Sequence, residues 1–309
     1  MPSLATVRLA NQSYAPDYLP VAIFVGGTSG IGRATAEAFA RYTKGNAHIV
    51  LVGRNAATAA AILAAFPKPS PTTTSPWKHE FVECDASLLH NAQATAAALR
   101  GRLPRVNFLL VSAGYFSLAG REDTAEGLDR KLVLSYYARA AFLVGLLPSL
   151  EAARAAGEPG GFLSVLGAGH GPRVDLQDLG LEKNYTAKAG MDASATYTDL
   201  MIEELASRHP SVALTHIFPG FVDTPLFNFT HWAARLAAPL IRTALFFMSK
   251  STADAGEYTL YGLLGAEPGA QRRGEHGGEI TEVPVYGLGS SEASRLVWVH
   301  TEEVLAAHA

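Results

Sequence analysis

The chain has 309 residues, of which 48% are hydrophobic and 17% charged, and its formal net charge is −3. This balance is typical of a globular protein with a large core and excludes a disordered chain. Because Lys and Arg never cluster beyond a pair, the sequence indicates no binding to nucleic acid or to an anionic membrane surface.

The cysteine and hydropathy patterns set further limits. Cys84 is the single cysteine, so no internal disulfide can form, and no Cys/His set at ligand spacing predicts a metal site. The first twenty residues lack the apolar run of a secretory signal. The apolar stretch 232–248 is too short and too interrupted to span a membrane. We therefore expect a cytoplasmic protein without a membrane span.

A glycine-rich stretch at residues 21–32, V-A-I-F-V-G-G-T-S-G-I-G, predicts a strand, a tight loop and a helix start. Glycines allow the backbone to approach a pyrophosphate closely, and the free N–H groups of a helix start favour an anion. An ordinary turn between strand and helix is the alternative. The residues that we expect to bind a dinucleotide here are Gly26, Thr28, Ser29, Gly30, Ile31 and Gly32.

The spacing of this loop, G-x-x-x-G-x-G, resembles the short-chain dehydrogenase/reductase (SDR) family, whose usual form is T-G-x-x-x-G-x-G. Val25 stands where that family usually has Thr. The resemblance covers residues 21–225 well and the remainder in outline. It implies an oxidoreductase that takes a hydride from, or gives one to, a nicotinamide cofactor.

The predicted elements alternate between strand and helix along the chain. After an irregular arm at residues 1–20, further strands are expected at 48–53, 80–83, 106–112, 162–166 and 212–218, and a short last one at 284–286. Helices are expected at 33–41, 56–66, 88–103 and 125–154, with another ending near 208, and Pro148 is expected to kink or break the 125–154 helix. This pattern predicts an α/β fold, one doubly wound parallel sheet of Rossmann type over 21–309, with helices on both faces. Residues 226–280 are expected to form a substrate lid and loop region, with a polar loop at 267–279.

Three places at predicted strand ends carry cofactor-binding candidates. Arg54 lies near the interval at which dinucleotide folds read the adenosine ribose, and a guanidinium there suits a 2′-phosphate, which favours NADP(H). A solvated Arg at the end of a strand is the alternative. The resemblance implies that Asp85 binds the adenine amino group, although it could equally start a helix. Ala113 and Gly114 keep the second half of the family motif N-N-A-G.

Residues 219–225 read P-G-F-V-D-T-P and resemble the family segment P-G-x-V-x-T. In that segment the backbone and the Thr bind the nicotinamide amide and a phosphate. The resemblance therefore implies four cofactor-binding residues here, namely Pro219, Gly220, Val222 and Thr224.

The catalytic positions depart from the family pattern, in which a Tyr-x-x-x-Lys pair moves the proton because the Lys lowers the pKa of the phenol. No Tyr-x-x-x-Lys occurs in this sequence. Residues 184–190, N-Y-T-A-K-A-G, place Lys188 at the Lys position, where it would also bind the cofactor, with Tyr185 three residues earlier as the candidate proton donor. Gly167 stands where the family has its Ser and Ser135 where it has its Asn. His170, on the loop after the fifth strand, is a second candidate donor.

The sequence thus predicts an NADP(H)-dependent oxidoreductase of a small organic carbonyl or alcohol with a non-standard proton donor. Two alternatives stay open. One is a non-redox enzyme on the same fold, such as a cyclase, isomerase or lyase, and the other is a non-catalytic dinucleotide-binding protein. The expected partner is a small-molecule substrate, and family resemblance suggests a homo-oligomer.

Overall fold

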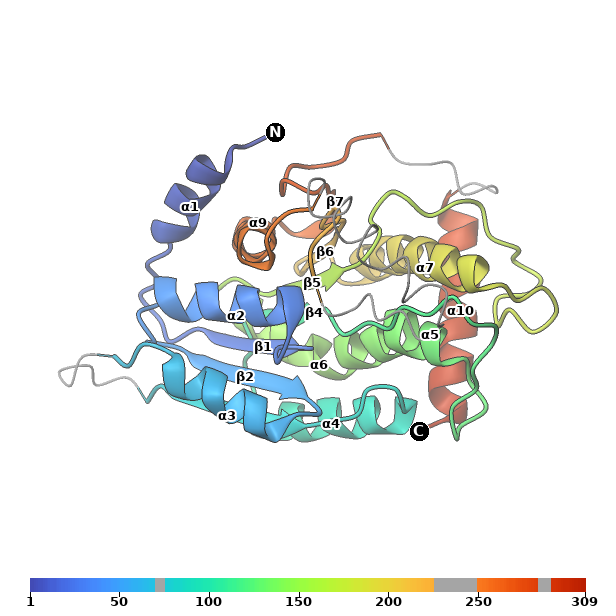
Figure 1. The fold of residues 1–309 in the computed structure, drawn as a ribbon, viewed down its shortest axis with the longest axis horizontal. Coiled ribbons are helices and arrows are strands. Elements are labelled where there is room, and N and C mark those ends of the chain that lie inside the picture. Colours follow the sequence, from blue (N-terminus) through green and yellow to red (C-terminus); the bar gives the residue numbers. More distant parts are fainter. Residues whose placement is uncertain (70–75, 225–248, 283–289) are drawn as a thin grey trace, which may run out of the picture.

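The fold is seen in a computed structural model that describes residues 1–69, 76–224, 249–282 and 290–309. A seven-stranded sheet in the order β3-β2-β1-β4-β5-β6-β7 forms its centre (Figure 1), and every strand pairs in parallel with its neighbours. The order reverses between β1 and β4, which opens a crevice at the carboxyl ends of these strands. The predicted doubly wound α/β fold is confirmed.

The strands are short apolar runs, and those in the middle of the sheet are buried on both faces, as in other parallel sheets. Every residue of β4 and β5 is buried. The bounds are β1 Val21–Val25, β2 His48–Gly53, β3 Lys78–Glu83, β4 Phe108–Val111, β5 Gly161–Val165, β6 Ala213–Ile217 and β7 Gly269–Arg273.

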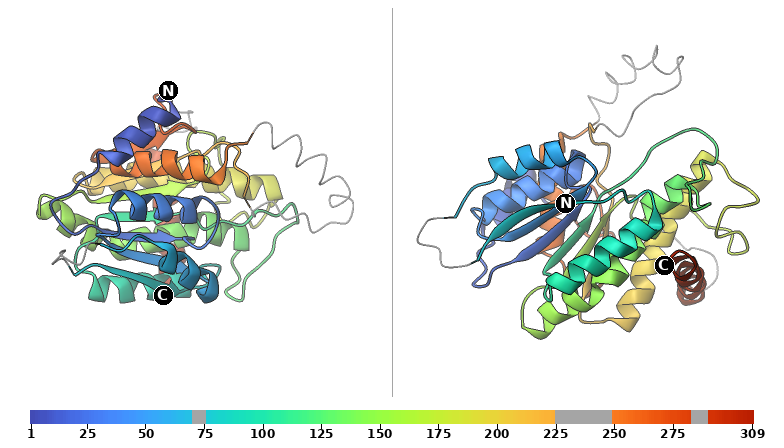
Figure 2. Two further views of the ribbon diagram at one scale, coloured as in Figure 1. Left: turned by 60° about the vertical axis from the view of Figure 1, so that its left-hand side comes forward. Right: turned by 90° about the horizontal axis from the view of Figure 1, so that it is seen from below.

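Helices cover both faces of the sheet in two layers (Figure 2). The helices α2 (Gly30–Tyr42), α3 (Ala56–Ala65) and α9 (Thr252–Leu264) enclose one apolar core. The helices α4 (Leu89–Arg102), α6 (Ala138–Ala155) and α7 (Ala187–Arg208) enclose the other, larger core. The C-terminal helix α10 (Ser290–Ala307) packs on α7.

Two local expectations near the ends of the chain were wrong. Residues 1–20 are not irregular throughout, because α1 (Leu4–Gln12) forms with Ser3 as its cap and packs on α9, where the Asn11 amide donates to buried Glu257. The expected polar loop at 267–279 contains β7, whose Arg272 pairs with buried Asp199 and partly buried Glu203 on α7. Both elements carry polar side chains, so a hydropathy pattern does not predict them. The partners that bury these side chains lie far away in the sequence.

The long helix expected at 125–154 is divided. It begins as α5 (Arg130–Leu132), widens into a π-helical turn at Val133–Tyr137 and continues as α6. Pro148 does not break α6, since the carbonyl that loses its partner belongs to Val144 on the exposed side of the helix. Arg130–Ala155 is long and apolar enough to cross a membrane, but 78% of its most apolar window is buried within the fold, as in a core helix.

The expected lid region falls into two parts. Its described part, α9 and β7, belongs to the covering layer and to the sheet itself rather than to a lid. Residues 225–248 and the expected last strand at 284–286 lie outside the described residues, so the lid stays a prediction there.

A pair of glycines tests how tightly α9 is packed on α2. A Cβ at Gly256 of α9 would lie 2.7 Å from the Ala34 Cβ and 2.8 Å from its carbonyl carbon, whereas a Cβ at Gly101 of α4 meets nothing within 4 Å. We expect Gly256→Ala to lower the free energy of unfolding by about 1–3 kcal/mol through overpacking. The matched Gly101→Ala should raise it by about 0.5–1 kcal/mol through helix propensity. Urea unfolding measures both, and equal effects would contradict this packing.

Candidate functional site

The glycine loop between β1 and α2 has the geometry of a phosphate cradle. Gly26 and Gly30 have φ values of +85° and +53°, which L side chains rarely adopt. A Cβ at Gly26 would lie 2.6 Å from the backbone nitrogen of Ala113, so the loop touches the end of β4. Ser29 begins α2 without a side-chain capping bond, so its hydroxyl leaves the first N–H groups to another acceptor.

The segment after β6 closes this cradle from the far side. A Cβ at Gly30 would lie 3.5 Å from the Thr224 methyl group, which places Thr224 directly on the glycine loop. Gly220 has a φ of +74°. Lys250 holds the segment, because its backbone N–H donates to the Phe221 carbonyl at 2.9 Å. The structure therefore brings together the two stretches that the sequence singled out separately.

Arg54 follows β2 directly, at the same carboxyl ends of the strands as the glycine loop. It is exposed, and within the described ranges no hydrogen bond or ion pair engages its guanidinium. A Cβ at Gly53, its neighbour, would lie 3.1 Å from the Thr28 hydroxyl of the glycine loop. A free cation beside the cradle fits the predicted contact with a 2′-phosphate.

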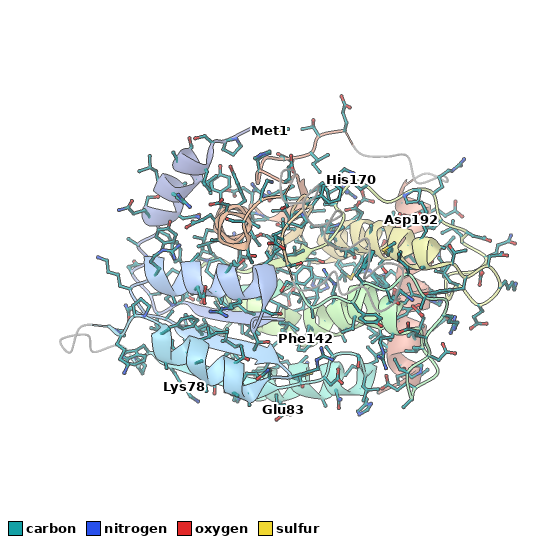
Figure 3. All side chains as sticks on the ribbon, in the orientation of Figure 1. Met1, Lys78, Glu83, Phe142, His170 and Asp192 are labelled. Atoms are coloured by element: carbon teal, nitrogen blue, oxygen red, sulfur yellow. The ribbon has the colours of Figure 1, made fainter. Side chains whose placement is uncertain are left out.

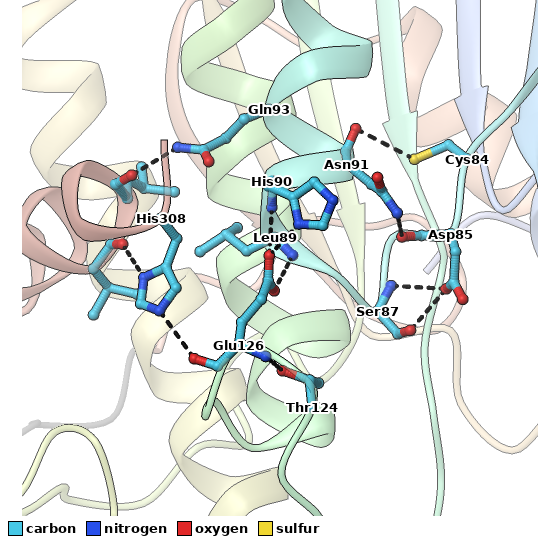
Figure 4. A network of polar contacts seen from close by, with 12 residues as sticks. Cys84, Asp85, Ser87, Leu89, His90, Asn91, Gln93, Thr124, Glu126 and His308 are labelled. Carbon is cyan, nitrogen blue, oxygen red and sulfur yellow. Dashed lines mark hydrogen bonds and ion pairs between the residues drawn. The ribbon is translucent and has the colours of Figure 1, made fainter.

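Asp85 lies after β3 and forms a local turn. One of its carboxylate oxygens accepts from the backbone N–H and the hydroxyl of Ser87, at 3.0 and 2.7 Å (Figure 4). The neighbouring start of α4 is capped from outside, since the Glu126 carboxylate accepts from the N–H groups of Leu89 and His90. Contact between Asp85 and an adenine stays a prediction.

The two predicted catalytic residues, Tyr185 and Lys188, do not meet. The Lys188 side chain is 78% exposed and pairs with Asp192, which Figure 3 labels on α7. The Tyr185 hydroxyl instead accepts from the ammonium of buried Lys131 at 3.0 Å. Burial, followed by the charge of Asp129, raises the pKa of Tyr185, so the phenol is not prepared to release a proton at neutral pH.

A different part of α7 faces the end of β5. Gly167 stands at the family Ser position, and a Cβ there would lie 3.2 Å from the Ala195 Cβ. If Ala195 is matched to the family Lys, Met191 falls at the Tyr position, four residues earlier. Lys188 is seven residues before Ala195, which is two turns and roughly 10 Å along the helix. Because two turns return to nearly the same face of the helix, the sequence alone does not show whether Lys188 or Ala195 stands at the family Lys position.

His170 occupies the loop after β5 at the same place. Its Cβ would lie 4.0 Å from a Cβ at Gly167, and its ring centroid is 4.1 Å from that of Phe218, the residue before Pro219. The side chain is exposed. His170 therefore links the end of β5 to the predicted nicotinamide-binding segment.

The sequence analysis missed a buried polar group beneath these strand ends. The Arg139 guanidinium, 1% exposed, donates to the Ser164 hydroxyl at 2.6 Å and to the carbonyls of Val165 and Ala113 at 2.8 and 2.7 Å. Burial lowers the pKa of Arg139 to about 9, which leaves it charged at neutral pH. The available signal was a lone charge inside the apolar run A-R-A-A-F-L-V of residues 138–144.

A second buried group adjoins it on the same face of the sheet. His216 donates through Nδ1 to an oxygen of the Asp199 carboxylate at 2.7 Å, and both side chains are fully buried. The other Asp199 oxygen accepts from the Gly169 N–H at 2.9 Å, which ties the loop after β5 to α7. Burial lowers the pKa of His216 despite the opposing carboxylate, so this histidine is neutral. Within the described residues, no three His, Cys, Asp or Glu side chains are grouped to hold a metal ion.

Comparison with known proteins agrees with this geometry. A family model described as short chain dehydrogenase matches residues 20–143. The chain is 36% identical over 262 residues to oxidoreductase andH of Emericella variicolor, covering 84% of this chain and 74% of that one. It is 35% identical over 228 residues to oxidoreductase AN1596 of Emericella nidulans, covering 74% of this chain but 66%, just under two thirds, of that one.

Among solved structures, a 3-oxoacyl (acyl-carrier-protein) reductase of Agrobacterium tumefaciens with NADP bound superposes with a TM-score of 0.56. The match covers 83% of this chain and 93% of that one at 16% identity, which supports the fold.

The parallel sheet with a glycine cradle at its point of reversal defines a Rossmann-type α/β protein. The chain belongs to the short-chain dehydrogenase/reductase family and is an oxidoreductase of that type.

The cradle can be tested at Gly32, the second residue after Gly30. A Cβ there would lie 2.6 Å from the Gly26 carbonyl oxygen and would also meet the Ser112 hydroxyl, so the loop must open. We expect Gly32→Ala to weaken dinucleotide binding at least tenfold in a fluorescence titration, because one 1.4 kcal/mol loss of fit is tenfold in affinity. Gly120→Ala, where a Cβ meets nothing within 4 Å, is the control. Equal affinities would show that this loop holds no dinucleotide.

Proposed function

We propose that this protein is an NADP(H)-dependent oxidoreductase that acts on a small organic carbonyl or alcohol and uses His170 to transfer the proton. One observation carries the proposal. The glycine cradle, Thr224 and His170 converge on the carboxyl ends of β1, β4 and β5, although they come from stretches far apart in the sequence.

The residues present fit a phosphorylated dinucleotide. A side chain at Gly26 or Gly32 would collide with the end of β4 or with the loop itself, so the glycines allow the tight loop, and the uncapped start of α2 offers N–H donors to a pyrophosphate. Thr224 would hold a further phosphate or the amide end. Exposed Arg54 supplies a fork of donors for a 2′-phosphate, which is the feature that separates NADP from NAD.

The bound cofactor supplies the hydride, and the chain has to supply the proton. Gly167, at the family Ser position, and Ala195, which packs on it, carry no exchangeable side-chain proton. His170 also lies beside Gly167 and has a ring that can carry a proton. Because its ring is exposed, it can recover its proton from solvent after each turnover.

Cofactor choice tests the first half of the proposal. We expect wild type to bind NADPH more tightly than NADH, and Arg54→Ala to weaken NADPH binding by roughly 10- to 100-fold, since a charge-assisted hydrogen bond contributes about 1.5–3 kcal/mol. NADH binding should not change. Arg105→Ala is a matched control, because Arg105 is 55% exposed and precedes β4 at the opposite edge of the sheet. Titration by ligand fluorescence measures each affinity, and failure of wild type to bind either nucleotide would sink the proposal.

Turnover tests the second half. With a panel of small carbonyl compounds and NADPH absorbance at 340 nm as the readout, His170→Asn should lower kcat by about 10²- to 10⁴-fold, as expected for loss of a general acid. The affinity for NADPH should stay the same. Tyr185→Phe and Lys188→Ala serve as comparisons and should keep most of the activity. If Tyr185→Phe loses activity and His170→Asn keeps it, Tyr185 is the proton donor instead. Binding without any oxidation of NADPH would favour a non-redox enzyme.

A cytoplasmic location and assembly into homo-oligomers belong to the same proposal and stay predictions from the sequence.

A further inference from the structure

Arg139 is a buried cation without a carboxylate partner. Its described hydrogen bonds go to one hydroxyl, Ser164, and to backbone carbonyls, and none of the described ion pairs includes it. The segments outside the described residues, 70–75, 225–248 and 283–289, contain no Asp or Glu. No other part of the chain can therefore supply the missing anion.

Such an arrangement is unfavourable by itself, because buried charges in proteins are normally paired. The neighbouring carboxylate, Asp199, is engaged by His216, by Arg272 and by the Gly169 N–H. None of these bonds involves Arg139, so its guanidinium has no carboxylate in direct contact. Retention of an unpaired charge beneath a cleft indicates that it acts on something in the cleft.

The guanidinium lies beneath the gap between two strand ends. It bonds the Ala113 carbonyl after β4 and the carbonyl of Val165, the last residue of β5. Its Nη2 lies 3.9 Å from where a Cβ at Gly114 would be, and Gly114 is half-buried at the surface of the cleft. One layer of backbone therefore separates the charge from any ligand that rests on Ala113 and Gly114.

We propose that Arg139 makes the site selective for the oxidation state of the dinucleotide, so that the reduced form binds more tightly than the oxidised form. This inference rests on the proposed binding of NADP(H). The oxidised nicotinamide ring carries a positive charge and the reduced ring is neutral, so a fixed cation beneath the cleft disfavours the first relative to the second. Through one layer of protein, this repulsion corresponds to roughly an order of magnitude in affinity.

Lys131 and Glu275, two other charged groups near the cleft, are held by partners of their own. Lys131 is held by the Ala119 and Gly120 carbonyls and by the Tyr185 hydroxyl. Glu275, beside Gly220, already pairs with Lys250 and is 42% exposed to solvent, which screens it. Arg139 is therefore a specificity-determining residue that acts through the backbone of Ala113 and Gly114.

The ratio of the two dissociation constants, NADP⁺ over NADPH, tests this inference without requiring turnover. We expect the ratio to fall about tenfold in Arg139→Gln, which keeps hydrogen-bond donors but removes the charge. Ser164→Ala removes a partner of Arg139 and keeps the charge, so it should leave the ratio within about twofold of wild type. Isothermal titration with each nucleotide gives the constants, and thermal melting shows that each variant is folded.

Arg139→Lys gives a second test should the glutamine variant not fold. A lysine buried at this place has a lowered pKa, so its charge is lost as the pH rises, whereas the arginine keeps its own for longer. Between pH 6.5 and 8.5, the ratio should therefore fall in Arg139→Lys and stay level in wild type. The inference would be overturned if both nucleotides bind and the ratio of their dissociation constants is the same with and without a charge at position 139. Binding of neither nucleotide to wild type would instead overturn the proposed function.

Discussion

The rest of the site depends on the close approach of the glycine loop to the end of β4. Gly26 lies so near the Ala113 nitrogen that no side chain fits between them, and its positive φ turns the chain directly into α2. This contact fixes where the first strand, the first long helix and the crevice between β1 and β4 meet. Thr224 and the loop after β5 reach the same point because parallel strands all end at one edge.

One row of neighbouring residues near the carboxyl ends of the strands changes from apolar to polar across the sheet. Val25, Val111, Ser164, His216 and Arg272 are register partners across β1, β4, β5, β6 and β7. The first two are apolar, and the last three are polar and buried. Asp199 and Glu203 both pair with Arg272 at the β7 end of the row, whereas Arg139 bonds Ser164 in the middle and has no carboxylate in direct contact. An apolar sheet therefore carries a fixed positive charge under the part of the crevice where ligands are expected.

The helix that flanks this crevice separates the two residues that the sequence predicts to be catalytic. Lys188 and Ala195 are seven residues apart, nearly two full turns, and small residues surround both. Helical periodicity cannot distinguish these two positions, and Lys188 is the one that matches the Lys of the family motif by residue type. The contact between Gly167 and Ala195 sets the register, and Lys188 is left at the solvent-exposed start of the helix with Asp192. Tyr185 then turns to Lys131, a partner 54 residues earlier.

The sequence by itself determined the order of strands and helices, the parallel sheet, the glycine loop and the segment at 219–224. Each of these follows from apolar runs or from residues that are neighbours along the chain, so local propensity is sufficient. Only the tertiary structure decided that β7 joins the sheet, that α1 packs on α9, which face of α7 meets β5, and that Arg139 is buried without an anion. These depend on contacts such as Arg272 with Asp199 and Asn11 with Glu257, between residues far apart in the sequence. No local pattern specifies such a partner, because burial and pairing of a charge are set by the packing of the whole fold.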